Sequence, residues 1–113
     1  APTTEPSRMA QLCGSAEGFL YYVSFAGITG AAQLSTSDIA ARVAEVRSRA
    51  RAPVAVGFGI RDAASAVAVG GFADAVVIGS ALVERLSGAM DAADIEGRAR
   101  DFLRPIRTAL DAR

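Results

Sequence analysis

Histidine is absent from this chain of 113 residues, and cysteine occurs once, at Cys13. Without histidine, the chain lacks the side chain that most often acts as a general base near neutral pH, and a Ser-His-Asp or Cys-His arrangement is excluded. A single cysteine excludes an intramolecular disulfide and a multi-cysteine metal site. We therefore expect no metal and no bound cofactor, and a free cysteine is typical of a reducing cytoplasm.

An excess of charge is also missing, because 12 basic and 12 acidic side chains cancel. This balance removes the electrostatic argument for a nucleic-acid partner or an anionic membrane. No segment approaches the roughly 20 uninterrupted apolar residues of a membrane helix, and no signal-peptide pattern opens the chain. With 51% apolar and 21% charged residues, we expect one folded cytoplasmic unit over residues 1–113.

Apolar spacing predicts three strands that alternate with helices. The predicted strands are Phe19–Ser24, Val54–Val56 and Ala75–Ile78, and the predicted helices cover 4–14, 38–50, 62–69, 81–86 and the chain from about 94 onward. The first strand is apolar at nearly every position, which predicts burial on both faces. Without hairpin signals, this alternation indicates a parallel sheet with right-handed crossovers. A complete (β/α)8 barrel needs about 250 residues, so the pattern fits part of a barrel or a very small open sheet.

Each predicted strand ends in glycine-rich backbone. The glycine-rich segments are Ala26–Gly30, Gly57–Gly59 and Gly79–Ser80. Glycine lacks Cβ, so a ligand can approach the amide groups closely, and a helix that starts there favours an anion, most often phosphate. Each segment alone is compatible with an ordinary turn, and the second lacks the third glycine of the dinucleotide fingerprint. Together, at the ends of parallel strands, they predict a phosphate site.

The remaining polar candidates have simpler explanations. Asp62 is predicted to cap a helix rather than to act in catalysis, and Arg61 is predicted to face solvent rather than a phosphate. Tyr21 and Tyr22 point to opposite sides of their strand, so one is expected in a pocket and the other under the helices. No carboxylate lies inside a predicted strand, so we expect substrate binding without a catalytic residue.

Three segments, in this order and at these separations, resemble the C-terminal part of the tryptophan synthase α subunit. They are Tyr21–Gly30 (YYVSFAGITG), Pro53–Ile60 (PVAVGFGI) and Ile78–Val83 (IGSALV). The opening Ala1–Thr4 resembles the end of the family's fifth strand, and Arg104–Ile106 resembles its proline-bearing last helix. The resemblance covers essentially the whole chain. It implies an α/β fold, the C-terminal half of a (β/α)8 TIM barrel, in which parallel strands alternate with helices.

The resemblance also implies a function and a set of site residues. The family is a lyase of tryptophan biosynthesis that cleaves indole-3-glycerol phosphate to indole and glyceraldehyde 3-phosphate, in a heterotetramer with a β subunit that alone carries pyridoxal phosphate. By position, the residues implied around the phosphate are Gly30, Phe58, Gly59, Gly79 and Ser80. Tyr21 is implied to face the indole-glycerol moiety, and Thr29 is implied to help close the site.

The family's catalytic glutamate and aspartate lie in the first half of the barrel, and no residue here matches them. Because Ala1 is not a start methionine, we expect a piece of a longer protein that is inactive alone. Two alternatives remain open. One is the phosphate-binding half of another barrel enzyme that acts on a phosphorylated sugar. The other is a non-catalytic module that associates with a copy of itself or with a complementary half through exposed sheet edges.

Overall fold

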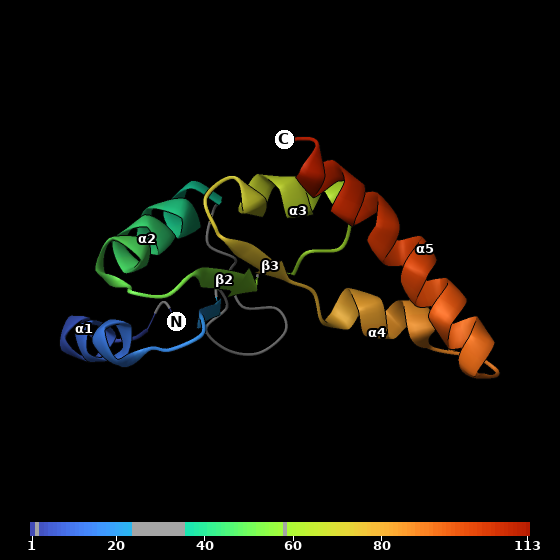
Figure 1. The fold of residues 1–113 in the computed structure, drawn as a ribbon, viewed down its shortest axis with the longest axis horizontal. Coiled ribbons are helices and arrows are strands. Elements are labelled where there is room, and N and C mark those ends of the chain that lie inside the picture. The colour runs from blue at the N-terminus through green and yellow to red at the C-terminus, as the bar shows by residue number, and fades with distance from the viewer. Residues whose placement is uncertain (2, 24–35, 58) are drawn as a thin grey trace.

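Three parallel strands form the sheet of the computed structural model, which describes residues 1, 3–23, 36–57 and 59–113 (Figure 1). The strands are β1 (Leu20–Val23), β2 (Val54–Gly57) and β3 (Ala75–Val77), in the spatial order β1-β2-β3. In the parallel register, Tyr22 lies opposite Val56, and Val56 lies opposite Val76. The predicted parallel sheet is therefore confirmed, with β2 at its centre.

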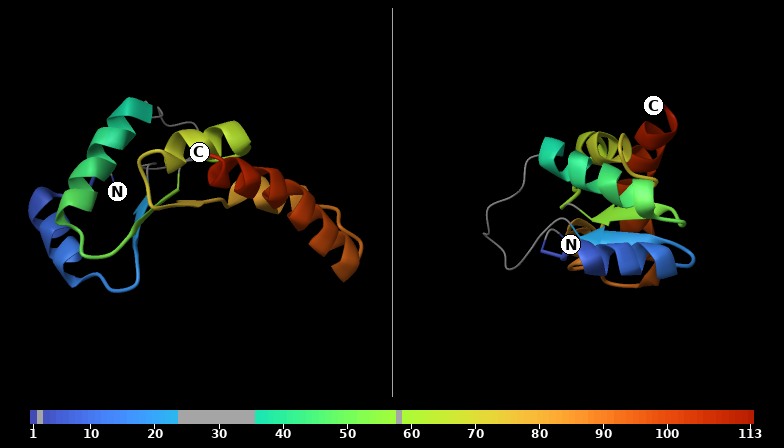
Figure 2. Two further views of the ribbon diagram at one scale, coloured as in Figure 1. Left: turned by 45° about the horizontal axis from the view of Figure 1, so that its top comes forward. Right: turned by 90° about the vertical axis from the view of Figure 1, so that its left-hand side faces the viewer.

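The helices alternate with the strands and pack against one another in sequence. They are α1 (Pro6–Ser15), α2 (Thr36–Arg49), α3 (Ala63–Gly70), α4 (Ser80–Leu86) and α5 (Ala92–Asp111). Contacts link α1 to α2, α2 to α3 and α3 to α5, while α4 packs on α5. Figures 1 and 2 show α4 and the start of α5 extending away from the sheet, and the C-terminus returning to α3. None of the helices in the described ranges has the length and apolar character needed to cross a membrane.

The helices begin within two residues of the predicted starts, and the reason for the difference can be seen at α1 and α5. The N-cap of α1 is Glu5 rather than Thr4, and Pro6 takes the first helical turn, where its missing N–H has no cost. Helix α5 begins at Ala92 rather than near Asp94, because the side chain of Asp91 accepts a hydrogen bond of 2.8 Å from the Asp94 N–H. The start of α5 is set by a side-chain cap, whereas Glu5 makes no side-chain capping bond and the start of α1 is marked by Pro6.

The core lies between the helices and one face of the sheet. Strand residues that share this face include Tyr22, Val54 and Val56, which are 3%, 0% and 0% exposed. Helix α2 covers them with an apolar stripe, whose Ile39 and Val43 are fully buried. The helix predicted over 38–50 is therefore confirmed, and the stripe is the face that it buries.

The second face of β1 is open, and the prediction that this strand is covered on both faces is wrong. Tyr21 is 48% exposed and Val23 is 40% exposed, although Tyr22 between them is buried. Successive side chains of a strand point to opposite faces, and the helices cover only one of these faces. The central strand differs, because Val54, Ala55 and Val56 are all buried. The apolar run in β1 therefore places Tyr22 in the core and leaves Tyr21 and Val23 on the open face of the sheet.

Candidate functional site

A pocket of about 400 Å³ opens at the carboxyl edge of the sheet. The last residue of each strand lines it: Val23 of β1, Gly57 of β2 and Val77 of β3. The turns after β2 and β3, with one tyrosine and one carboxylate, complete the lining: Tyr21, Gly59, Ile60, Arg61, Gly79, Ser80, Ala81 and Glu84. In barrels built from parallel strands, this edge is where ligands bind.

Four of the predicted site residues line this one pocket: Tyr21, Gly59, Gly79 and Ser80. The other three, Thr29, Gly30 and Phe58, lie outside the described residues. Tyr22 packs under the helices while Tyr21 lines the pocket, so the prediction for the tyrosine pair is confirmed. The structure thus joins segments that lie about 60 residues apart in the sequence, from Tyr21 to Ser80.

In the turn after β2, two amide groups bond to the cap of α3, and two others have no such bond. The N–H groups of Arg61 and Asp62 donate to the Ser65 hydroxyl, at 3.1 and 3.2 Å. The N–H groups of Gly59 and Ile60 have no hydrogen bond to another described residue, and both residues line the pocket. Gly59 has φ +54°, a conformation that glycine adopts without strain. These two amides therefore have no hydrogen-bond acceptor among the described residues.

The turn after β3 leads directly into α4. Gly79 is the N-cap, and its carbonyl accepts hydrogen bonds from Leu82 and Val83. The N–H groups of Ser80 and Ala81 have no acceptor elsewhere in the described part of the chain. Amides in a first helical turn carry partial positive charge and favour anions. The Ser80 hydroxyl adds a further donor to the same wall of the pocket.

One positive and one negative side chain line the pocket, Arg61 and Glu84. Arg61 is exposed, as predicted, and it also borders the pocket, which the sequence interpretation had not favoured. Glu84 was not singled out, although it lies four residues after Ser80 and so on the same side of a helix. The pocket lacks a paired acid and base among the described residues. Nor do the described residues hold a cluster of three or more metal-ligating side chains.

Asp62 is confirmed as a helix cap. Its carboxylate accepts a hydrogen bond of 2.8 Å from the Ser65 N–H, and the Ser65 side chain completes a reciprocal capping box. The hydrogen bond from the Ser65 backbone, with that from its side chain, holds the pKa of the Asp62 carboxyl below its usual value. This carboxylate is therefore engaged in starting α3 rather than placed for proton transfer.

A parallel sheet with helices over one face and a pocket at its carboxyl edge is the architecture of part of a (β/α)8 barrel. The family profile "Tryptophan synthase alpha chain" matches residues 1–107. The chain belongs to the tryptophan synthase alpha chain family.

Relatives and solved structures support this membership. The chain is 54% identical over 113 residues to the tryptophan synthase alpha chain of Xanthomonas campestris pv. campestris, and 54% identical over 112 residues to that of Xylella fastidiosa. It covers 42% of the length of each. Tryptophan synthase subunit alpha from Legionella pneumophila superposes with a TM-score of 0.76 at 30% identity, over 99% of this chain and 40% of that one. Tryptophan synthase from M. tuberculosis, in an aminoacrylate-bound form, gives 0.73 at 27% identity over 96% and 37%.

Proposed function

We propose that this chain forms the phosphate-binding part of a tryptophan synthase α chain, the lyase that cleaves indole-3-glycerol phosphate to indole and glyceraldehyde 3-phosphate. The observation that carries the proposal is the pocket at the carboxyl edge, which residues of two strand-to-helix turns line together. Barrel enzymes often hold a phosphate in their last two such turns and at the start of a short extra helix. The turns after β2 and β3, followed by the short α4, match this arrangement.

The proposed roles follow from the chemistry of each group. The N–H groups of the two turns and the Ser80 hydroxyl donate to the phosphate oxygens, and charge makes such hydrogen bonds stronger. Arg61 supplies positive charge at the rim of the pocket. Tyr21 presents its ring to the indole-glycerol part of the substrate. Thr29, Gly30 and Phe58 are assigned to loop closure and phosphate binding from the resemblance to the family.

Proton transfer is assigned to residues outside this chain. Cleavage needs a positioned acid and base, and Glu84 on α4 is the one carboxylate that lines the described pocket. In this proposal the chain alone releases no indole. The family and the solved tryptophan synthase from M. tuberculosis support a pyridoxal-phosphate-dependent β subunit as the partner of the complete α chain. A cytoplasmic location belongs to the same proposal.

Ligand preference tests the proposal. The chain is titrated with indole-3-propanol phosphate and with glycerol phosphate, and amide chemical shifts are followed by NMR. We expect the indole compound to bind more tightly, with the largest shifts at Gly59, Ser80 and Ala81. Ser80→Ala removes one donor to a charged group, so binding should weaken by about tenfold. Ser48→Ala is the matched control, because Ser48 bonds only to Glu45 on the surface of α2.

Two results would overturn this function. Equal affinity for both ligands favours a barrel enzyme for another phosphorylated substrate. Release of indole from indole-3-glycerol phosphate by the chain alone would refute the assignment of catalysis to residues elsewhere.

The open face of the sheet favours a second candidate, a module that pairs with a copy or with a complementary half. Tyr21 and Val23 expose apolar surface there, and β1 and β3 each have one hydrogen-bonded neighbour among the described strands. Burying apolar surface and pairing strand edges both favour association. Sedimentation tests this candidate: a monomer at micromolar concentration excludes self-pairing.

A further inference from the structure

Helix α4 forms one wall of the pocket, and its Ala81 and Leu82 pack partly buried against the core. It has seven residues, from Ser80 to Leu86, and none of them is buried. It packs against α5. A helix this short has little intrinsic stability, so its position depends on what holds it. The position of the Ser80 and Ala81 amides therefore depends on the junction between α4 and α5 as well as on the core contacts of Ala81 and Leu82.

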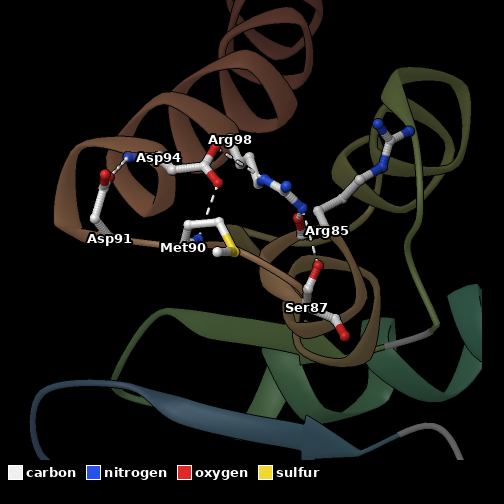
Figure 3. A network of polar contacts seen from close by, with 6 residues as sticks. All are labelled: Arg85, Ser87, Met90, Asp91, Asp94 and Arg98. Carbon is white, nitrogen blue, oxygen red and sulfur yellow. Dashed lines mark hydrogen bonds and ion pairs between the residues drawn. The ribbon is translucent and has the colours of Figure 1, made fainter.

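Arg98 of α5 makes that junction with a single guanidinium group (Figure 3). Its Nη1 donates to the carbonyl oxygen of Ser87, the C-cap of α4, at 2.9 Å, and to the carbonyl oxygen of Arg85 at 3.4 Å. Its Nε donates to Asp94 Oδ1 at 3.1 Å. The last carbonyls of a helix have no partners within that helix, and they carry partial negative charge. Arg98 therefore supplies a donor to the carbonyls of Arg85 and Ser87 and places positive charge at the C-terminal end of α4.

Asp94 extends this junction into the connection between the helices (Figure 3). Its Oδ2 accepts from the Met90 N–H at 3.1 Å, while its own N–H donates to the Asp91 side chain at 2.8 Å. Gly88, at φ +82°, turns the chain between these contacts. The carboxylate thus holds the connection on one side and orients Arg98 on the other.

We propose that Arg98 is a positioning residue for the phosphate site, because it sets where α4 places Ser80 relative to the turn after β2. The proposal rests on the proposed function. A second contact also holds α4 on α5, since the Arg85 guanidinium of α4 lies over the Phe102 ring of α5, 5.5 Å from its centroid. This contact is between side chains and does not reach the carbonyl oxygens of Arg85 and Ser87. Arg98 is the residue that reaches them.

The positioning role of Arg98 requires a planar guanidinium with several N–H donors. Arginine donates from several nitrogens in a fixed plane, so it contacts two carbonyls and a carboxylate at once. Lysine concentrates its charge on one nitrogen at the end of a flexible chain. Arg98→Lys therefore keeps a cation near Asp94 and loses the simultaneous contact with Ser87. This variant separates the effect of charge from the effect of geometry.

The test compares phosphate binding in three variants of the complete 113-residue chain. Glycerol phosphate is titrated against Arg98→Ala, Arg98→Lys and Arg100→Ala, and circular dichroism at the same temperature verifies folding. Arg100 is the matched control, since it pairs with Glu96 four residues away on α5, in the same way that Arg98 pairs with Asp94. We expect the dissociation constant to rise about 3- to 30-fold in Arg98→Ala, less in Arg98→Lys, and to stay unchanged in Arg100→Ala.

The amide signals give a readout that loss of stability alone would not move. In the ligand-free Arg98 variants, the Ser80 and Ala81 signals should shift while those of Gly59 and Ile60 stay in place. If Arg98→Ala does not fold, Arg98→Lys decides, and a dissociation constant equal to that of the unsubstituted chain overturns the proposal. Failure of the unsubstituted chain to bind glycerol phosphate would instead overturn the proposed function, and this inference with it.

Discussion

The hydroxyl oxygen of Tyr21 occupies the space that a side chain on Gly57 would need. A Cβ built on Gly57 would lie 2.5 Å from this oxygen and 3.1 Å from the ring carbon Cζ. Tyr21 lies diagonally from Gly57 across the β1–β2 pair, a separation that aromatic side chains can span. The ring therefore crosses the end of β2 inside the pocket, and glycine at position 57 makes room for it.

Gly57→Ala should move the Tyr21 ring and change the pocket more than it changes stability. Tyr21 is half exposed, so its ring can swing away at a cost of about 1 kcal/mol in the free energy of unfolding. The moved ring should alter binding of indole-3-propanol phosphate. Tyr21→Phe in the same chain removes the nearest atom and should restore most of the stability, measured by urea unfolding. Gly79→Ala is the control, because its Cβ meets no atom within 4 Å. An equal loss in Gly79→Ala would contradict the steric explanation.

Asp74→Ala should destabilise the start of β2. Its Oδ2 accepts from the buried Val54 N–H at 2.9 Å, and its Oδ1 pairs with Arg47 at 2.8 Å. Leaving a buried N–H without an acceptor costs about 1–3 kcal/mol. Arg47→Ala removes only the partly exposed ion pair and a bond to the Phe72 carbonyl, and should cost less than about 1 kcal/mol. Chemical unfolding of both variants checks this order, and the reverse order would contradict it.

Alkaline pH should destabilise the fold through Tyr22. Burial raises the pKa of the Tyr22 phenol above its ordinary value, and the positive charge of Arg42 opposes the rise. The folded state thus favours the neutral phenol, so this contribution to stability is complete below the unfolded pKa of about 10. It is lost as the pH rises toward and through the folded pKa. Thermal unfolding of Tyr22→Phe between about pH 8 and pH 11 should show a smaller alkaline loss than the unsubstituted chain. Equal losses would show that another group is responsible.

Acid should loosen the junction between α4 and α5 through Asp94. Hydrogen bonds from the Arg98 side chain, and next from the Met90 backbone, lower the pKa of the Asp94 carboxyl. Because the folded pKa is below the unfolded one, the stability from this carboxylate is present above the unfolded pKa and is lost as the pH falls through the folded pKa. In Asp94→Asn, the Met90 and Arg98 signals should no longer shift with acid. Persistence of the same titration in this variant would contradict the assignment.

Much of the fold was predictable because it depends on short-range patterns. The stripe of Ile39 and Val43, the cap at Asp62 and the three parallel strands were all found where periodicity and capping residues indicated. The open face of β1 was not predicted. An apolar run around Tyr21 does not say which other segments lie over each face, because that depends on residues distant in the chain.

The pocket was predicted in part for the same reason. Glycines after strands mark places where backbone can meet a ligand, and they led to Gly59 and Gly79. Glu84 and Arg61 carry no such local signal, since charged residues on helices and in loops are ordinarily solvated. They join the site because folding brings α4 and the turn after β2 to the same pocket.

By itself, the sequence determined the alternation of strands and helices, the glycine-rich strand ends and the family, because each is written in local spacing and residue type. The tertiary structure alone decided that Tyr21 crosses Gly57, and that Arg98 holds the end of α4. Both relationships join segments of the chain that are paired only after folding, when parallel strands come into register and helix ends come within hydrogen-bonding distance.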